Sequence, residues 1–409
     1  MRISTSNMYA STIDNLQRRQ IDLDEAQDRT SSGKRVTKAS DDPAAAARAE
    51  RALAIELRSD TSQRSAEASR VLVSQTESAL GDAHELLSQA REALVAGGNA
   101  SYTDVERAIQ AEKIKGVRDA LFAVANRSDG SGTYLFGGQS SNQPPFVDTP
   151  TGVQFRGITG QTQTEAESAL PLSTDGAAAW LSSGSGNGVF VTSATVNNVT
   201  NTAVKNAWID PGSVKDPSAL FPVADTGYRI RFTSATGYAI ESFALATPTI
   251  ATIESTGTFS AGGAIELHGT SVNIAGNPAA GDQFEIRPST PTSSVFGVLD
   301  AAIANLRLPG RTGAQRAQAT SDSLRDADAT LGTLRTMRSA AGTVLNKIDN
   351  RVDQLATQKL NAQTERSNAE DLDLIQALAD FKAKQNGYDV ALKSYSTVQK
   401  LSLFQYINP

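Results

Sequence analysis

Residues 71–98 read VLVSQTESALGDAHELLSQAREALVAGG, and this stretch decides the fold class. Within it Val73, Leu80, Leu87 and Leu94 recur every seven residues. Alanines stand between them, and no proline interrupts the run. A repeat of this kind predicts a helix that packs along a narrow apolar seam against other helices. The sequence therefore indicates a helical bundle.

The helix that carries this seam is predicted to be long. Asp42 followed by Pro43 is a good start, because the aspartate can accept hydrogen bonds from the first amides and proline has no N–H to leave unpaired. Gly97 and Gly98 provide a C-terminal cap. A helix from residue 43 to about residue 96 would be on the order of 80 Å long.

Further helical regions follow on both sides of a glycine-rich turn. A second helix is predicted over residues 103–126, with its apolar positions at Val105, Ile109, Val117, Leu121 and Val124. Glycines 130 and 132 predict a turn that leads into a short strand over residues 133–136. A last helical region starts near Ala314 and continues to the C-terminus. Its first apolar residues follow three-and-four spacing: Leu331, Leu334, Ala341, Leu345, Ile348, Val352, Leu355 and Ala362.

The composition changes in the middle of the chain. Residues 141–300 hold 11 of the 14 prolines and 17 of the 31 glycines, together with both tryptophans. They also carry 6 Lys and Arg against 13 Asp and Glu, so this part is more negative than the whole chain, whose net charge is −6. Tyr228, Ile230 and Phe232 alternate with Arg229 and Arg231, which is typical of a strand with one buried face. This part is predicted to be a small, acidic, β-rich domain.

Composition also excludes several classes of function. The chain has 409 residues, 39% of them hydrophobic and 20% charged, which is typical of a packable water-soluble protein. The acidic balance and the lack of a basic stripe argue against nucleic acid as a partner. No apolar run is long enough for a membrane span, and the start Met1-Arg2-Ile3-Ser4-Thr5 lacks the apolar core of a cleaved secretory signal. With no cysteine and two histidines, little material for catalysis or metal binding remains.

Both chain ends carry a narrow apolar seam interrupted by glutamine. We expect these helices to pair with each other and then with neighbouring copies, because each alone buries too little apolar area to offset its ordering entropy. An ordinary two-helix bundle within one monomer is the alternative. The assembly seam is predicted at Ile13, Leu16, Leu23, Leu374, Leu378, Phe381, Tyr388, Leu392 and Tyr395. Contacts with other subunits or partners are predicted at the C-terminal tip, at Leu401, Leu403, Phe404 and Tyr406.

These patterns predict a mainly α fold with a β-rich insert, in three parts. The terminal coiled-coil arms are residues 1–42 with 366–409, and we expect them to be disordered in the monomer. A helical bundle with a short β-hairpin takes residues 43–145 with 296–365. The outer β-rich domain is residues 146–295.

The remaining motifs have structural explanations. Gly33-Lys34 lacks the spacing and the preceding strand of a phosphate-binding loop. Asp41-Asp42 offers too few ligands for a cation, so helix capping is the better interpretation. His84 lies beside the leucine seam and is interpreted as a packing residue, and His268 lies in an alternating strand with no triad partner at recognisable spacing. We therefore predict no catalytic, cofactor-binding or metal-binding residues, and no enzyme activity.

Several motifs in combination resemble a known family. They are the opening MRIST, the loop SSGKRVT (31–37) leading to SDDPA (40–44), the SDG…YLFGG segment (128–138), and the closing LSLFQ (401–405). Together they resemble the FlgL family of flagellar hook–filament junction proteins (hook-associated protein 3), which are relatives of flagellin. The resemblance covers the two arms, about 250 residues, and the ending Ser402-Leu403-Phe404 favours this family over flagellin itself.

The resemblance implies a flagellin-like fold and a structural role in the bacterial flagellum. Such a protein would be exported unfolded through the flagellar type III channel and assemble as a ring-like zone. Its implied partners are copies of itself, hook-associated protein 1, flagellin and a flagellar export chaperone, with neither nucleic acid nor insertion into a membrane.

Two alternatives remain open on the sequence alone. The chain could be a filament subunit of the flagellin type. It could also be a secreted adhesin or glycan-binding protein that acts through residues 146–295, because Trp180 and Trp208 could stack on sugars.

Overall fold

The computed structural model describes residues 5–140, 142–164 and 169–407. Their contacts form two compact units, Met1–Ser65 with Asn350–Pro409 and Ala66–Asp349. The long helices α2 (Pro43–Gly97) and α6 (Gly313–Glu370) each contribute residues to both units. Helix α2 confirms the long helix that was predicted from residue 43 to about residue 96.

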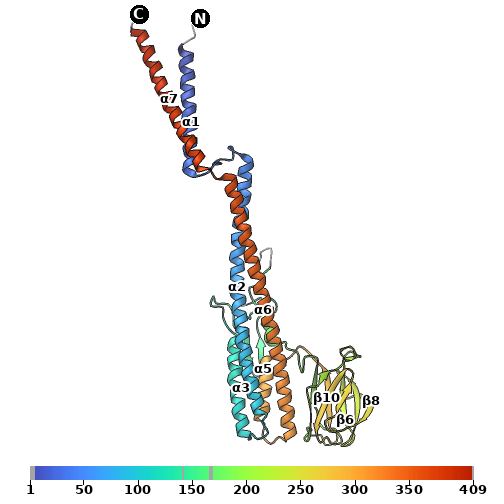
Figure 1. Cartoon of the computed structure of the whole chain (residues 1–409). Coiled ribbons are helices and arrows are strands. Elements are labelled where there is room, and N and C mark those ends of the chain that lie inside the picture. Colours follow the sequence, from blue (N-terminus) through green and yellow to red (C-terminus); the bar gives the residue numbers. More distant parts are fainter. Residues whose placement is uncertain (1–4, 141, 165–168, 408–409) are drawn as a thin grey trace. The chain divides into compact units, whose positions relative to one another are not determined.

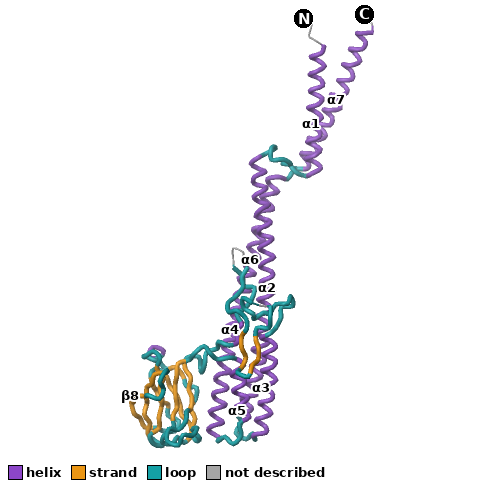
Figure 2. The backbone as a smooth tube through the Cα atoms, turned by 180° about the vertical axis from the view of Figure 1, so that it is seen from behind, coloured by secondary structure: helices purple, strands orange, loops and turns teal. Residues whose placement is uncertain are grey.

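The second unit is built on a helical core. Besides α2 and α6 it contains α3 (Asp104–Ala125) and α5 (Val295–Arg307), which lie side by side with them (Figures 1 and 2). Leu80, Leu87 and Leu94 of the predicted seam are buried in this core, and Val73 is buried just beyond it. The other helices contribute, among others, Ile114, Leu121, Leu299, Ile303, Leu331 and Leu334.

Helix α3 buries the predicted apolar face only in its second half, where Leu121 and Val124 lie in the core. Its start is as expected, since Thr103 and Glu106 form a reciprocal capping box. Val105 and Ile109, however, are 71% and 52% exposed. The buried positions in the first half of α3 are instead Arg107, Gln110, Ala111 and Ile114. The sequence pattern missed these positions because a stripe of apolar residues does not identify a buried arginine or glutamine; Arg107 is paired with Asp104 and with the Asn99 carbonyl.

The short strand predicted over residues 133–136 is absent from this described stretch. A single bridge pairs Ser128 with Tyr134, and the residues between them form a loop around Asp129. The Asp129 carboxylate accepts hydrogen bonds from the amides and hydroxyls of Ser131 and Thr133. Burial works to raise the pKa of Asp129, but these four bonds outweigh it and lower the pKa to about 2. The side chain thus replaces a strand ladder as the organiser of the turn.

A hairpin and a short helix add side chains to the core that the four longer helices form. The hairpin is β1 (Phe146–Thr149) with β2 (Gly152–Phe155), and the helix is α4 (Gly176–Trp180). Phe146 and Trp180 are fully buried among the helices. The Trp180 ring stacks on that of Phe296 with centroids 5.8 Å apart and meets Phe136 edge-on at 5.4 Å. The domain boundary predicted at residue 146 assigned this segment to the outer domain, whereas its side chains lie in the helical core.

One buried arginine ties this segment to two helices. Arg118 of α3 donates to Asp148 of β1, at 2.5 and 2.9 Å, and to Asp300 of α5, at 3.1 Å. These two carboxylates raise the pKa of Arg118, so the side chain stays charged. A buried charge is tolerated only when it is fully paired. The ion-pair cluster therefore holds the hairpin against α3 and α5.

The remaining strands form a β-sandwich. One sheet has the order β3-β11-β6-β7-β8, and the other has β4, β10 and β5, with β9 also pairing with β10. The strands of the first sheet are β3 (Phe190–Ala194), β6 (Thr226–Phe232), β7 (Gly237–Ala244), β8 (Ala251–Thr258) and β11 (Gln283–Pro288). Those of the second are β4 (Ala207–Ile209), β5 (Ser213–Val214), β9 (Ala264–Leu267) and β10 (Thr270–Gly276), and a one-turn helix η1 (Pro217–Ala219) follows β5.

The sandwich has its own apolar core. Tyr228, Ile230 and Phe232 are buried there, as their alternation predicted. On the opposite face of the same sheet, Arg229 pairs with Glu285 at 2.7 Å and Arg231 with Glu241 at 2.6 Å. The predicted fold class, mainly helical with a β-rich insert, is thus confirmed.

Candidate functional site

The terminal helices α1 (Thr5–Ser32) and α7 (Leu374–Ile407) lie side by side and antiparallel (Figures 1 and 2). They form the candidate assembly surface. The pair is closely spaced at Gly387, where an added Cβ would lie 2.7 Å from Nη1 of Arg19.

The structure brings together only part of the predicted seam. Leu16 and Leu23 of α1 are half-buried, as are Phe381, Tyr388 and Tyr395 of α7. Ile13, Leu374, Leu378 and Leu392 are exposed. The more protected positions of α7 are Ala377, Phe381, Lys384, Gln385, Gly387, Tyr388, Ala391 and Tyr395, and six of these eight follow the four-three spacing of a coiled coil. Two of these positions are alanines, and each has a larger leucine next to it in the sequence. The predicted apolar stripe followed the leucines and was therefore rotated around the helix relative to the buried one.

The pair leaves much of its apolar surface uncovered. Ile21, Ile375 and Val390 are exposed in addition to the four residues just named, and Ile375 is 86% exposed. The sequence analysis did not single out these three residues because they lie off the predicted seam. An apolar residue on the polar face of a helix with a narrow apolar stripe is nevertheless a sign of a further contact surface. Apolar surface of this extent on one helix pair is typical of an interaction site.

The predicted tip contacts cannot be placed in this surface. Helix α7 extends to Ile407, but the side chains of Leu401, Leu403, Phe404 and Tyr406 lie outside the described residues.

Two short linkers join the pair to α2 and α6. Helix α1 ends at Ser32, and Gly33 caps it, because its φ is +69° and its backbone N–H donates a hydrogen bond to the Arg29 carbonyl. The linkers then pair with each other, because the Arg35 amide donates to the Glu370 carbonyl and the Leu372 amide to the Gly33 carbonyl. Gly33-Lys34 is therefore part of a helix cap and a linker.

The two aspartates of the first linker accept hydrogen bonds from backbone amides. Asp42 accepts from the Ala45 amide at the start of α2, and Asp41 accepts from the amides of Thr37 and Lys38. These backbone bonds lower the pKa of both carboxyls. The capping interpretation is thus confirmed for Asp42, whereas Asp41 binds amides of the linker that precedes it and does not cap α2.

Both histidines contact residues of the protein's own fold. His84 is half-buried on α2, and burial together with Arg335 and Arg338 lowers its pKa. His268 lies in the turn between β9 and β10, not in the strand predicted for it. Its ring stacks on Tyr228, and its Nε2 lies 2.7 Å from Glu254.

The described ranges offer neither a metal site nor a membrane-spanning helix. No group of three or more His, Cys, Asp or Glu residues there could hold a metal ion. None of the helices in those ranges has the length and apolar character needed to cross a membrane.

The proposed sugar platform is not available at Trp180. This side chain is fully buried between Phe296 and Phe136, and Trp208 is half-buried on β4. The interpretation of Trp180 as a sugar-stacking residue is therefore wrong, because the ring completes the helical core.

Comparison with known proteins agrees with this architecture. Residues 3–141 match the bacterial flagellin N-terminal helical region, and residues 324–407 match the bacterial flagellin C-terminal helical region. Together these two matches cover more than half of the chain.

Curated relatives and a solved structure give a narrower likeness. Flagellar hook-associated protein 3 of Salmonella typhimurium is 35% identical over 168 residues, which are 40% of this chain and 51% of the relative. The protein of the same name from Escherichia coli is 32% identical over 148 residues, 36% of this chain and 47% of the relative. The alignments thus span about half the length of these relatives. The crystal structure of Xanthomonas campestris FlgL matches with a TM-score of 0.67 and 26% identity, over 78% of this chain and 99% of that one. The chain therefore carries both helical end regions of bacterial flagellin, and among the proteins it resembles are flagellar hook-associated protein 3 (FlgL) proteins.

Proposed function

We propose that this protein is a structural, non-enzymatic adaptor of the bacterial flagellum that joins the hook to the filament. One observation carries the proposal. Both ends of the chain match the helical regions of flagellin, while the curated relatives bear the name flagellar hook-associated protein 3. A chain of this kind can pack against filament subunits through shared helical ends and still differ from them in its middle.

The proposed mechanism is folding coupled to polymerisation. The helix pair α1 and α7 leaves Ile375, Leu378 and Val390 exposed, so pairing within one chain removes only part of its apolar surface from water. Contacts with neighbouring copies would cover the rest and offset the ordering entropy of the helices. In this proposal the arms are disordered in the free monomer and become rigid in the assembled ring.

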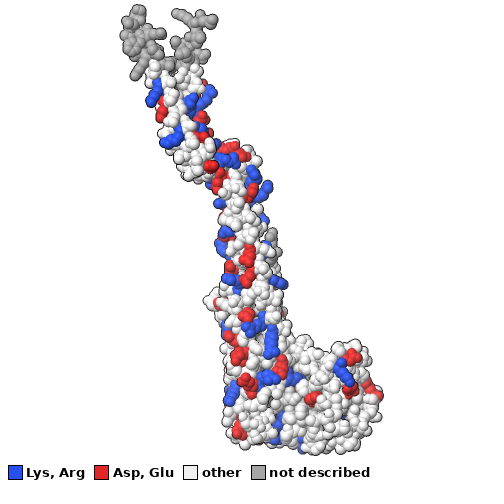
Figure 3. Space-filling model, viewed as in Figure 1, with Lys and Arg blue, Asp and Glu red and all other residues white. Residues whose placement is uncertain are grey.

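The proposed partners follow from this placement. They are copies of the same chain, hook-associated protein 1 on the hook side, flagellin on the filament side and an export chaperone before assembly. The protein would be secreted and would reside at the hook–filament junction. On the face shown in Figure 3, basic and acidic side chains are interspersed along the helices, which supports the expectation that nucleic acid is not a partner.

The two alternatives have less support. A filament subunit of the flagellin type would fit the helical ends equally well, but the matched curated relatives are named as hook-associated proteins. An adhesin acting through residues 146–295 has lost Trp180 as a contact residue.

Deletion of the gene tests the proposal. We expect the deletion strain to make hooks without attached filaments and to shed filaments or flagellin into the medium, as seen by electron microscopy and by immunoblotting of the supernatant. The full-length gene supplied in trans should restore attached filaments. A deletion strain with filaments still attached to its hooks would contradict the proposal, and hooks with neither filaments nor secreted flagellin would favour the filament-subunit alternative.

A further inference from the structure

The sandwich is connected to the helical part of its unit by two chain segments. The incoming segment follows α4, and the outgoing one precedes α5. Ser183 and Ser293 exchange backbone hydrogen bonds of 3.0 Å, and the Ser185 amide donates to the Thr290 carbonyl at 2.9 Å. The apolar cores on the two sides of this neck share no residue. Apolar packing therefore does not fuse the sandwich to the helices.

Three side chains from the start of α6 and the residue before it reach the sandwich instead. Thr312, just before α6, donates to the Lys205 carbonyl. Gln318 accepts from the Ile209 amide at 2.9 Å. Arg325 donates to the Thr192 carbonyl at 2.7 Å. Gln318 and Arg325 are seven residues apart, which places them on the same side of α6.

Arg325 is the strongest of these contacts. Its side chain is 6% exposed. Its guanidinium also donates to the Thr192 hydroxyl at 3.3 Å, to Asp322 at 3.0 Å and to Asp326 at 2.9 Å. Gln318 donates to the same oxygen of Asp322 at 3.0 Å. Gln318, Asp322 and Arg325 thus form one polar network, which we call the latch.

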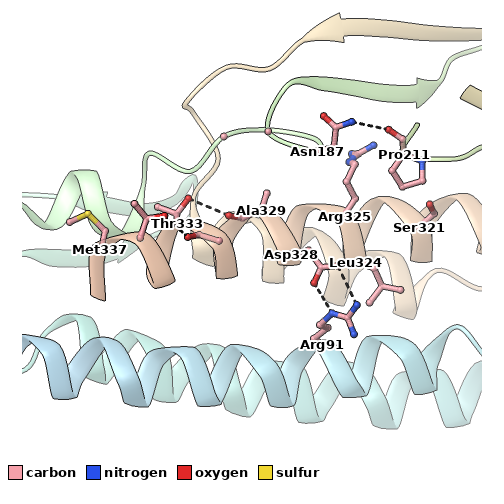
Figure 4. Close-up of a pocket in the computed structure, with 14 residues that line it drawn as sticks. Arg91, Asn187, Pro211, Ser321, Leu324, Arg325, Asp328, Ala329, Thr333 and Met337 are labelled. Atoms are coloured by element: carbon pink, nitrogen blue, oxygen red, sulfur yellow. Dashed lines mark hydrogen bonds and ion pairs between the residues drawn. The ribbon is translucent and has the colours of Figure 1, made fainter. Parts of the chain in front are cut away.

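The space beside the latch is not filled. A groove of about 920 Å³ lies between α6 and the sandwich neck, lined by Gly184, Asn187 and Gly188 on one side and by Ala329, Gly332 and Thr333 of α6 on the other. Figure 4 shows Arg325 rising from α6 toward Asn187 and Pro211, while Arg91 pairs with Asp328 on the other side of the helix. Small, polar and incompletely packed interfaces of this kind permit domain motion.

We infer that the sandwich is a hinged domain that the latch on α6 holds in one docked position, with Arg325 as the residue that positions it. Breaking the latch releases the sandwich on its two-segment neck without unfolding either core. This inference is independent of the proposed role at the junction.

Asp322 makes the latch sensitive to pH. Burial in the docked position raises the pKa of this carboxyl to about 6, and Arg325 opposes that rise. The charged groups that act on it are Arg325 and Asp326, both on α6, whereas the sandwich contributes the uncharged Thr192 and the Ile209 amide. Because the raised pKa means that protonation favours docking, docking weakens as the pH rises through 6. If the pKa returns to 3.8 on release, docking is about tenfold weaker at pH 7 than at pH 5.

Distance measurement between two spin labels tests the inference. The chain has no cysteine, so Thr256→Cys on β8 and Ser339→Cys on α6 give a unique pair in the full-length protein. We expect one narrow distance distribution at pH 5 and a second, broader population that gains about tenfold in ratio by pH 7. Arg325→Gln should give the broad population at both pH values, with an unchanged circular dichroism spectrum.

Two variants on the same helix serve as controls. Arg338→Gln removes a half-exposed pair with Glu77 that does not touch the sandwich, and it should leave the distribution unchanged. Asp322→Asn mimics the protonated carboxyl and should abolish the pH dependence. A wild-type distribution in Arg325→Gln would overturn the inference, and so would a release that also occurs in Arg338→Gln. Persistence of the pH dependence in Asp322→Asn would overturn the role of Asp322.

Discussion

Replacement of Leu16 by aspartate is expected to leave Ala66–Asp349 folded and to abolish attachment of the filament to the hook. Leu16 is half-buried in the pair formed by α1 and α7. A carboxylate there must either be desolvated or force the helices apart. The helix pair buries little apolar surface, so we expect one such change to prevent its ordering during assembly. Swimming in soft agar and electron microscopy of a complemented deletion strain measure the effect.

The neighbouring residue provides a matched control. Gln17 is exposed and lies one step along the same helix, so Gln17→Asp introduces the same charge without removing a seam residue. We expect normal swimming from Gln17→Asp and hooks without filaments from Leu16→Asp, at equal levels of secreted protein. Motile cells with attached filaments in the Leu16→Asp strain would refute the role of the seam.

Replacement of Trp180 by alanine is expected to lower the free energy of unfolding of the helical core by about 3–5 kcal/mol. The indole is fully buried and in ring contact with Phe296, Phe136 and Phe146. Its loss leaves a large cavity where the hairpin, α4 and α5 meet. Urea unfolding followed by far-ultraviolet circular dichroism measures the change.

An exposed apolar residue provides the comparison for this variant. Val105 of α3 is 71% exposed, and Val105→Ala should change the free energy of unfolding by no more than about 0.5 kcal/mol. If Trp180→Ala were equally mild, then Trp180 would not be a core residue and the sugar-binding alternative would regain support.

The sequence was sufficient for the elements that depend on local periodicity. Helix α2 was predicted almost to the residue, because Leu80, Leu87 and Leu94 repeat without interruption and Pro43 and Gly97 mark its ends. The alternation of Tyr228, Ile230 and Phe232 likewise predicted which face of β6 is buried. In both cases the signal lies within one element.

The sequence was insufficient where burial depends on a distant partner. Arg118 is buried because Asp148 and Asp300 neutralise it, and neither carboxylate is near it in sequence. Trp180 lies in a segment with a β-rich composition, yet its ring packs on Phe296.

The candidate site shows the same limit on a smaller scale. The seam of α7 contains Ala377 and Ala391 at protected positions, while Leu374, Leu378 and Leu392 lie beside it. The size of the side chains predicted a stripe through the leucines, whereas the packing of α1 on α7 buries the stripe that contains the alanines. Only the three-dimensional pairing of the helices separates the residues that hold the pair together from those left for other chains.

The most direct measurement is amide hydrogen exchange across α1 and α7 in the free protein, diluted well below any self-association. If isolated molecules lack the contacts that these two helices need, their amides should exchange within seconds, while those around Leu87 on α2 stay protected for hours. Slow exchange along α1 and α7, equal to that of α2, would mean that a solitary molecule already holds them rigid, and coupled folding and assembly would be ruled out.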